Sequence, residues 1–168
     1  MQLNDILSKF FGLLEHEADL YQELLTLIEK EKQAVVATNL AELNETAKVK
    51  DNLLLKIRIL DEQREHLLRK LADDLGHPAQ ALTLAKLSQL VEAPQANRIK
   101  RLRSTFLSVI AKIQRANDCN RTLFSHSLEL VRSSVNLLNN VMTSSPVYFP
   151  SGNIQHRDQT GKILVKEI

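Results

Sequence analysis

The side chains that could bind a metal ion or act in catalysis are scattered along this sequence. Its five histidines include no pair one helical turn apart beside a carboxylate, the spacing that holds zinc on a helix. No glycine-rich loop follows a predicted strand, so no motif for binding phosphate is present. The many carboxylates before residue 76 alternate with Lys and Arg, as on a solvated helix face. We therefore expect no catalytic site, no metal site, no cofactor and no enzymatic activity.

A single cysteine and a basic run are the next candidates for chemistry. Cys119 alone excludes an intrachain disulfide and fits a reducing compartment, and we interpret it as a small buried hydrophobic residue. The run NRIKRLRS, residues 97–104, carries four cationic side chains that suit phosphate groups. It lacks the interleaved aromatic residues on which bases stack. Nucleic acid is therefore not an expected partner.

Two amides in the segment RANDCNRTLFSHSL, residues 115–128, lie where apolar residues otherwise recur with a helical period. A buried amide such as Asn120 lowers stability unless it is hydrogen-bonded. Two interpretations of Asn117 and Asn120 stay open. They either fix the register of the helix or pair with Glu17, Glu31 or Arg64, or they belong to a surface that docks another helix reversibly.

These residues must be positioned by helices. Only four glycines and four prolines interrupt 168 residues, and 4% aromatic content implies a core of Leu, Ile, Val and Ala. Residues 3–35 and 40–75 each repeat apolar side chains at alternating spacings of four and three, with a face wide enough for more than one partner helix. Asn39 followed by Glu42 predicts an N-cap and a tight connection, and Gly76 before Pro78 predicts a helix end.

The second half of the chain is predicted to contain a short helix and then a long one. The short helix should span about residues 78–91, and the long one, if unbroken from about 95 to 142, is on the order of 70 Å. Periodicity stops after residue 143 in a segment rich in Pro, Gly and Ser. The predicted fold is all-α, an elongated antiparallel helical bundle or coiled coil with about three long helices and one short helix. Residues 1–143 form this bundle, and residues 144–168 form a flexible, irregular tail.

Charge and hydropathy indicate which helices are neighbours and where the protein works. Residues 1–38 carry three basic and seven acidic side chains, whereas residues 77–143 carry nine basic and three acidic ones. The acidic N-terminal half is therefore expected to lie against the basic C-terminal helix. No run of apolar residues is long enough to insert into a membrane, and the first residues do not resemble a secretory signal. We expect a cytoplasmic protein.

The order of several motifs resembles that of the FlgN-type flagellar export chaperones over nearly the whole chain. The first helix carries Tyr21 and LLTLIEKE, and the second carries LAELNETAKVKDNLLLKIRILDEQREHLL. The long helix carries NDCNRTLFSHSLELV, with Asn117 and Asn120 in an Asn-x-x-Asn pattern. In the tail, Tyr148 and Gly152 lie four residues apart, and a Gly-Lys pair follows at 161–162.

This resemblance implies a cytoplasmic chaperone of the hook-associated proteins one and three, which prevents premature assembly and delivers these clients to the export gate. It implies that the C-terminal part of the long helix binds the client's terminal helix, and that Tyr148 and Gly152 dock on the export-gate component. The implied client-binding residues are Asn117, Asn120, Arg121, Leu123, Phe124, Leu128, Val131, Val135 and Leu138. The alternative is a coiled-coil structural adaptor or homodimer in which the long helix associates with itself and has no client.

Overall fold

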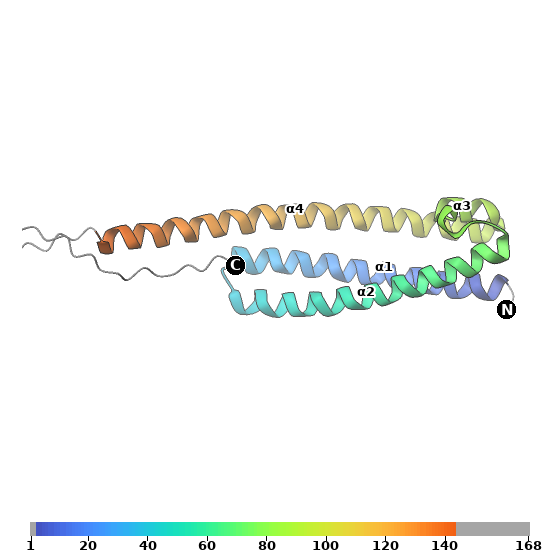
Figure 1. The fold of residues 1–168 in the computed structure, drawn as a ribbon, viewed down its shortest axis with the longest axis horizontal. Coiled ribbons are helices and arrows are strands. Elements are labelled where there is room, and N and C mark those ends of the chain that lie inside the picture. The colour runs from blue at the N-terminus through green and yellow to red at the C-terminus, as the bar shows by residue number, and fades with distance from the viewer. Residues whose placement is uncertain (1–2, 144–168) are drawn as a thin grey trace, which may run out of the picture. The chain divides into compact units, whose positions relative to one another are not determined.

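The protein is described from a computed structural model, in which residues 3–143 are placed (Figure 1). All regular structure in this range is helical, which confirms the all-α prediction. The elements are α1 (Leu3–Val36), α2 (Leu40–Leu75), the 3-10 helix η1 (Ala79–Ala81), α3 (Leu84–Leu90) and α4 (Ala93–Thr143). Contacts group the chain into two compact units, Met1–Phe124 and Ser125–Ile168, and the boundary between them falls within α4.

The connection between α1 and α2 is tight because both helix ends are capped within it. The Glu42 backbone N–H donates to Asn39 Oδ1 at 3.1 Å, and Asn39 Nδ2 donates to Glu42 Oε2 at 3.0 Å. These bonds confirm the predicted N-cap. At the end of α1, the N–H of Asn39 bonds the Ala34 carbonyl at 2.9 Å, and Thr38 takes φ 55°. This left-handed conformation is normally reserved for glycine.

The end of α2 follows the prediction as well. Gly76 has φ 66°, and its N–H donates to the Asp73 carbonyl at 3.2 Å while the His77 N–H donates to the Ala72 carbonyl at 2.9 Å. This pair of bonds satisfies two carbonyls that the end of a helix leaves without partners. Because each cap is a local interaction, the residues that form it are visible in the sequence.

The predicted short helix over residues 78–91 is wrong as a single element. The chain forms the 3-10 turn η1, then extends through Leu82 and Thr83 before α3 begins. Thr83 Oγ1 accepts from the Lys86 N–H at 3.2 Å, so this hydroxyl starts a new helix where the pattern suggested continuity. Because the helix is interrupted here, the side chain of Leu82 reaches the core and is fully buried.

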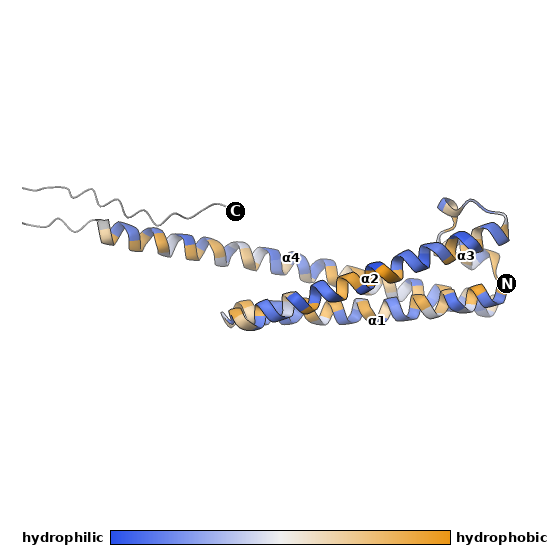
Figure 2. Cartoon of the chain, turned by 60° about the horizontal axis from the view of Figure 1, so that its bottom comes forward, coloured by the Kyte–Doolittle hydropathy of each residue, from blue (hydrophilic) through white to orange (hydrophobic). Residues whose placement is uncertain are grey.

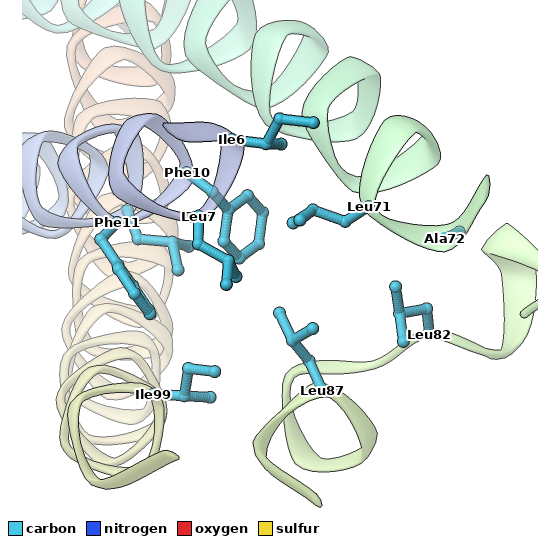
Figure 3. Packing of buried hydrophobic residues seen from close by; sticks show 10 residues of the cluster. Ile6, Leu7, Phe10, Phe11, Leu71, Ala72, Leu82, Leu87 and Ile99 are labelled. Carbon is cyan, nitrogen blue, oxygen red and sulfur yellow. The ribbon is translucent and has the colours of Figure 1, made fainter. Parts of the chain in front are cut away.

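Helix α1 is the central element of the first unit. It packs closely against α2, and its side chains also contact α3 and the first part of α4 (Figure 3). One apolar cluster fills the space between these four helices, and its buried members are Ile6, Leu7, Phe10, Phe11, Leu14, Leu71, Ala72, Leu82, Leu87 and Ile99. A second cluster, farther along α1, consists of Leu20, Leu24, Leu27, Ile28, Leu53 and Ile57.

The directions of the helices follow from these contacts. Helix α2 runs antiparallel to α1, because only three residues, 37–39, connect the two helices. Gln95 Nε2 donates to Asn4 Oδ1 and Asn120 Nδ2 donates to the Ile28 carbonyl, so the part of α4 in the first unit runs parallel to α1. Helix α4 is continuous over 51 residues, which corresponds to about 75 Å.

Replacing Thr38 with glycine tests the strain in the α1–α2 connection. A β-branched residue at positive φ is disfavoured by about 1–2 kcal/mol. Glycine avoids this cost, but its larger conformational entropy in the unfolded chain offsets part of the gain in stability. We expect Thr38→Gly to raise the free energy of unfolding by about 0.5–1 kcal/mol in denaturant titrations. Thr26→Gly, at an exposed site inside α1, is the control and should lower it by roughly 0.5 kcal/mol. A destabilised Thr38→Gly protein would contradict this account of the connection.

Candidate functional site

One face of α4 is apolar within both compact units. In the first unit this face is covered: Ile99 is fully buried, Val109 is 1% exposed, and Ile113 and Ala116 pack against the second apolar cluster. Tyr21 of α1 meets Phe106 edge to face, with ring centroids 5.9 Å apart. This part of α4 therefore contributes to the bundle core.

The same face continues into the second unit without being buried. A helix turns by 100° per residue, so Leu128, Val131 and Leu138 lie within 80° of the direction in which Asn120 points. Their side chains are 60%, 59% and 61% exposed, respectively. Figure 2 shows apolar residues recurring along α4 to its C-terminal end. Isolated exposed leucines are normal, but a contiguous row on one helix face marks an interaction surface.

A second row of apolar side chains widens this surface. Leu130, Leu137 and Val141 are exposed and lie beside the first row, with Ser134 between the two. Ser134 Oγ donates to the Leu130 carbonyl at 2.9 Å, so the hydroxyl is satisfied within the helix. We call the combined surface the apolar face of α4; it consists of Leu128, Leu130, Val131, Val135, Leu137, Leu138, Val141 and Met142. Its width suits contact with more than one helix.

The two amides of the Asn-x-x-Asn pattern occupy different environments. Asn117 is exposed, whereas Asn120 is 5% exposed, and its Nδ2 donates to the Ile28 carbonyl of α1 at 2.9 Å. Asn120 Oδ1 is buried and accepts no hydrogen bond from the residues that the structure describes. The interpretation that Asn120 pairs with Glu17, Glu31 or Arg64 is wrong, because its only hydrogen bond among the described residues goes to the Ile28 carbonyl.

The remaining predicted client-binding residues lie along the same helix. Arg121 is exposed, and Leu123, Phe124 and Val135 are half-buried. Phe124 ends the first compact unit, so the predicted set spans the point where coverage by the bundle gives way to exposure. Asn120 therefore lies inside the bundle of the first unit, whereas Leu128, Val131, Val135 and Leu138 lie on one side of α4 in the second unit. The predicted export-gate residues Tyr148 and Gly152 lie outside the described residues.

A polar layer separates the two apolar clusters. Arg64 of α2 places Nε 3.1 Å from Glu17 Oε2 of α1, and it also pairs with Asp61. Burial raises the pKa of the Glu17 carboxyl, because loss of hydration outweighs the attraction of Arg64. Burial likewise raises the pKa of the neighbouring Tyr21 hydroxyl, and the negative charge of Glu17 adds to this effect. The layer can hold α1 and α2 in one register.

Two further ion pairs connect α1 to its neighbours. Lys50 of α2 pairs with the buried Glu31 near the α1–α2 connection. Arg98 of α4 donates to Glu15 Oε1 from two nitrogens, at 2.9 and 2.6 Å, and its guanidinium lies 4.8 Å from the centre of the Phe11 ring. The basic run thus docks α4 on the acidic first helix, in line with the charge asymmetry of the sequence.

The prediction that Cys119 is buried is wrong. Its side chain is exposed because Asn120, the next residue, points into the bundle, and adjacent helical residues point in directions 100° apart. Within residues 3–143 no group of three His, Cys, Asp or Glu side chains is close enough to hold a metal ion. No described helix has a stretch apolar enough to cross a membrane.

A groove that was not predicted from the sequence lies between α1 and α2. It has a volume of about 740 Å³, opens widely to solvent and is lined by Lys9, Gly12, Leu13, Ile59, Glu62, Gln63, His66 and Leu67. Gly12 is the residue that could have indicated this groove from the sequence. A glycine inside a helix lowers the stability of the helix relative to alanine, so its presence calls for a reason other than helix formation. A Cβ atom at Gly12 would meet no atom of residues 3–143 within 4 Å, so no contact in this range requires glycine there.

The raised pKa of Glu17 predicts a measurable pH dependence of stability. As the pH rises above the ordinary pKa of 4.5, Glu17 loses its proton in the unfolded chain before it does so in the folded protein. The free energy of unfolding therefore falls as the pH rises toward the higher pKa of the folded protein. Glu17→Gln should remove this fall. Urea titrations from pH 4.5 to 7.5 compare the two proteins, with Glu23→Gln, exposed on the same helix, as the control that keeps the wild-type slope. Equal slopes for wild type and Glu17→Gln would contradict the assignment.

Comparison with known proteins identifies the family. The family model described as FlgN protein matches residues 1–156, which include every described helix. No curated protein and no solved structure matches the chain. The match covers far more than half of the sequence, and it confirms the resemblance carried by the first helix, the second helix and the Asn-x-x-Asn segment. The chain belongs to the FlgN family, a family of flagellar export chaperones that act on hook-associated proteins.

Proposed function

We propose that this chaperone binds the hook-associated proteins one and three through the apolar face of α4, prevents their premature assembly and delivers them to the export gate. The observation that carries the proposal is the change in exposure along one helix face. Val109 on this face is covered by the bundle, whereas Leu128, Val131 and Leu138 are more than half exposed. An apolar helix face of this kind is the standard docking surface for an amphipathic client helix.

The polar breaks in this surface suit reversible binding. Leucine and valine side chains supply the apolar area, while Ser127 and Ser134 interrupt it and limit the area buried per turn. A client must be held firmly enough to stay unassembled and loosely enough to be handed over. Micromolar affinity, about −8 kcal/mol, meets both needs by mass action and requires no nucleotide.

A homodimer is the competing use of the same surface. Two copies of α4 could cover each other's apolar faces, as in a coiled-coil adaptor without a client. Light scattering over a range of concentrations, with and without a client's terminal helical fragment, separates the two. A monomer that forms a stoichiometric complex supports chaperoning, whereas a dimer that ignores the fragment supports the adaptor.

Two charges on the apolar face should abolish client capture. Leu128 and Val131 are exposed, so replacing both with Asp leaves the bundle core intact while placing carboxylates where client side chains would be buried. We expect the affinity for the terminal helical fragments of hook-associated proteins one and three to fall at least about 100-fold, with little change in helix content. Calorimetry and circular dichroism provide the two measurements.

The matched control introduces the same two charges on the opposite side of the helix. Ser133 and Asn136 are exposed, and they lie about 160–220° around α4 from Asn120. The Ser133→Asp, Asn136→Asp protein should bind clients like the wild type. Capture that survives in a folded Leu128→Asp, Val131→Asp protein would place the client surface elsewhere.

Tyr148 provides a test of export-gate docking. An aromatic ring with a hydroxyl in a segment bounded by Pro and Gly is a typical anchor for a partner's pocket. We expect Tyr148→Ala to weaken binding to the export-gate component by about 10- to 100-fold, as for a buried aromatic hot spot. Client affinity and melting temperature should hardly change. A lower melting temperature with unchanged gate binding would instead show that Tyr148 packs on the chaperone itself.

A further inference from the structure

The cations of the basic run at residues 97–104 differ in what they contact. Arg98 docks α4 on α1, through its pair with Glu15 and its position over the Phe11 ring. The side chains of Lys100, Arg101 and Arg103 are exposed, and none of them forms an ion pair within residues 3–143. The packing of α4 on α1 therefore uses one cation of the run and leaves the other three without a role.

The exposed charges of α2 and α4 are balanced differently. On α2, exposed arginines pair with carboxylates one turn away, Arg58 with Glu62 and Arg69 with Glu65. On α4, no Asp or Glu lies within a turn of Lys100 or Arg103, and these two cations are themselves one turn apart. Like charges at this spacing repel each other and lower the stability of the helix. Carboxylates from another molecule would remove this repulsion.

Two exposed aliphatic side chains lie on the same side of α4 as these cations. Leu107 is 55% exposed and Ile110 is 37% exposed, although both belong to the first compact unit. At about 100° per residue, both side chains point about 100–160° around the helix from the buried Val109. Three polar neighbours share this direction, and we call the five residues the outer stripe of α4: Lys100, Arg103, Leu107, Ile110 and Gln114.

The outer stripe has the spacing of a helix–helix seam. Its members follow one another at intervals of three and four residues, as the contact positions of a coiled coil do. From Lys100 to Gln114 the stripe extends about 21 Å, or about four turns, which is the length of a short partner helix. Phosphate groups of a nucleic acid or a lipid would use the cations but would gain nothing from Leu107 and Ile110. The stripe therefore fits a helix that presents apolar side chains beside carboxylates.

We propose that the outer stripe of α4 is a docking site for an acidic amphipathic helix of a partner protein. Carboxylates of this partner pair with Lys100 and Arg103, and its apolar side chains cover Leu107 and Ile110. Exposed ion pairs contribute little and are screened by salt, so the complex is weak, salt-dependent and readily reversible. The outer stripe shares no residue with the apolar face of α4, so this inference stands whether or not that face binds a client.

A synthetic peptide tests the chemistry of the partner. The probe contains three heptads with leucine at positions a and d and glutamate at e and g, and its twin has lysine at e and g. We expect the full-length protein to bind the glutamate peptide at least about tenfold more tightly than the lysine peptide, and to lose most of this affinity at about 0.5 M salt. Amide NMR shifts should change at residues 97–115. Changes confined to residues 125–142 would show that the peptide uses the apolar face, and the outer stripe would be wrong.

Lys100→Glu, Arg103→Glu tests the two cations of the stripe. Both side chains are exposed and unpaired within residues 3–143, so the melting temperature should change by no more than about 2 °C. Affinity for the glutamate peptide should fall at least about tenfold, because two attractive charges become repulsive.

The matched control reverses the same two residue types elsewhere on the helix. Lys112 and Arg115 are also three residues apart and exposed, but they lie about 60–120° from Val109 on the other side of α4. The Lys112→Glu, Arg115→Glu protein should bind the glutamate peptide nearly as well as the wild type. An equal loss of affinity in both proteins would reveal general attraction to a basic helix and would overturn the site.

Leu107→Ala distinguishes a helix from a bare anion. Truncation of this exposed side chain should leave the melting temperature nearly unchanged and weaken the glutamate peptide by roughly three- to tenfold. If the peptide binds Leu107→Ala as it binds the wild type, while Lys100→Glu, Arg103→Glu abolishes binding, the stripe attracts anions in general and the helix-docking site is wrong.

A second copy of this chain is the remaining occupant, because α1 exposes the carboxylates of Asp5, Asp19 and Glu23. Light scattering at low salt, without peptide, tests this. We expect the wild type and Lys100→Glu, Arg103→Glu to have the same mass. A larger mass for the wild type that falls in this variant would assign the outer stripe to self-association and overturn the proposal.

Discussion

The structure depends on one constraint: an apolar helix face must be covered by something. Helix α4 carries such a face, and the side chains of α1 cover it from Ile99 to Asn120. From Leu128 onward the face stays exposed, although its leucines and valines are as hydrophobic as those in the core. Burial of each such side chain is favourable by about 1.5–3 kcal/mol. In the covered part of α4 this free energy stabilises the fold, whereas in the uncovered part it remains available for binding another molecule.

Polar contacts decide where the covered part is held. Glu17 and Arg64 form a layer between the two apolar clusters, and Glu31 with Lys50 forms another near the α1–α2 connection. Apolar seams of leucine and isoleucine tolerate sliding by a heptad, whereas a charged group displaced from its partner would be buried alone. These layers therefore add little net stability but make one register of α1 and α2 far better than its neighbours. The raised pKa of Glu17 reflects the same balance, because burial of the carboxyl outweighs the attraction of Arg64.

The sequence predicted two helix caps that depend on neighbouring residues, but it missed the partner of Asn120 and two local features, at Cys119 and Thr83. Asn39 and Gly76 act within a few residues of the helix ends they cap, so their roles were readable. The acceptor for Asn120 is the carbonyl of a residue 92 positions earlier, and any helix offers many equivalent carbonyls. Exposure of Cys119 followed from the seam itself, since a residue adjacent to the buried Asn120 cannot share its direction. The break at Thr83 was missed because apolar spacing continues across it.

A chaperone without nucleotide chemistry must obtain capture and release from the same equilibrium. A fully apolar, fully exposed helix would capture clients tightly but would also associate with itself. A fully covered helix would remain soluble but would have to unfold before it could bind. The serines between the two apolar rows, and an amide with an unsatisfied oxygen at the edge of the bundle, each lower the stability of one bound arrangement without abolishing it. Under the proposed function, a small free-energy difference between the exposed and client-bound states would allow a competing partner to shift the population by mass action alone.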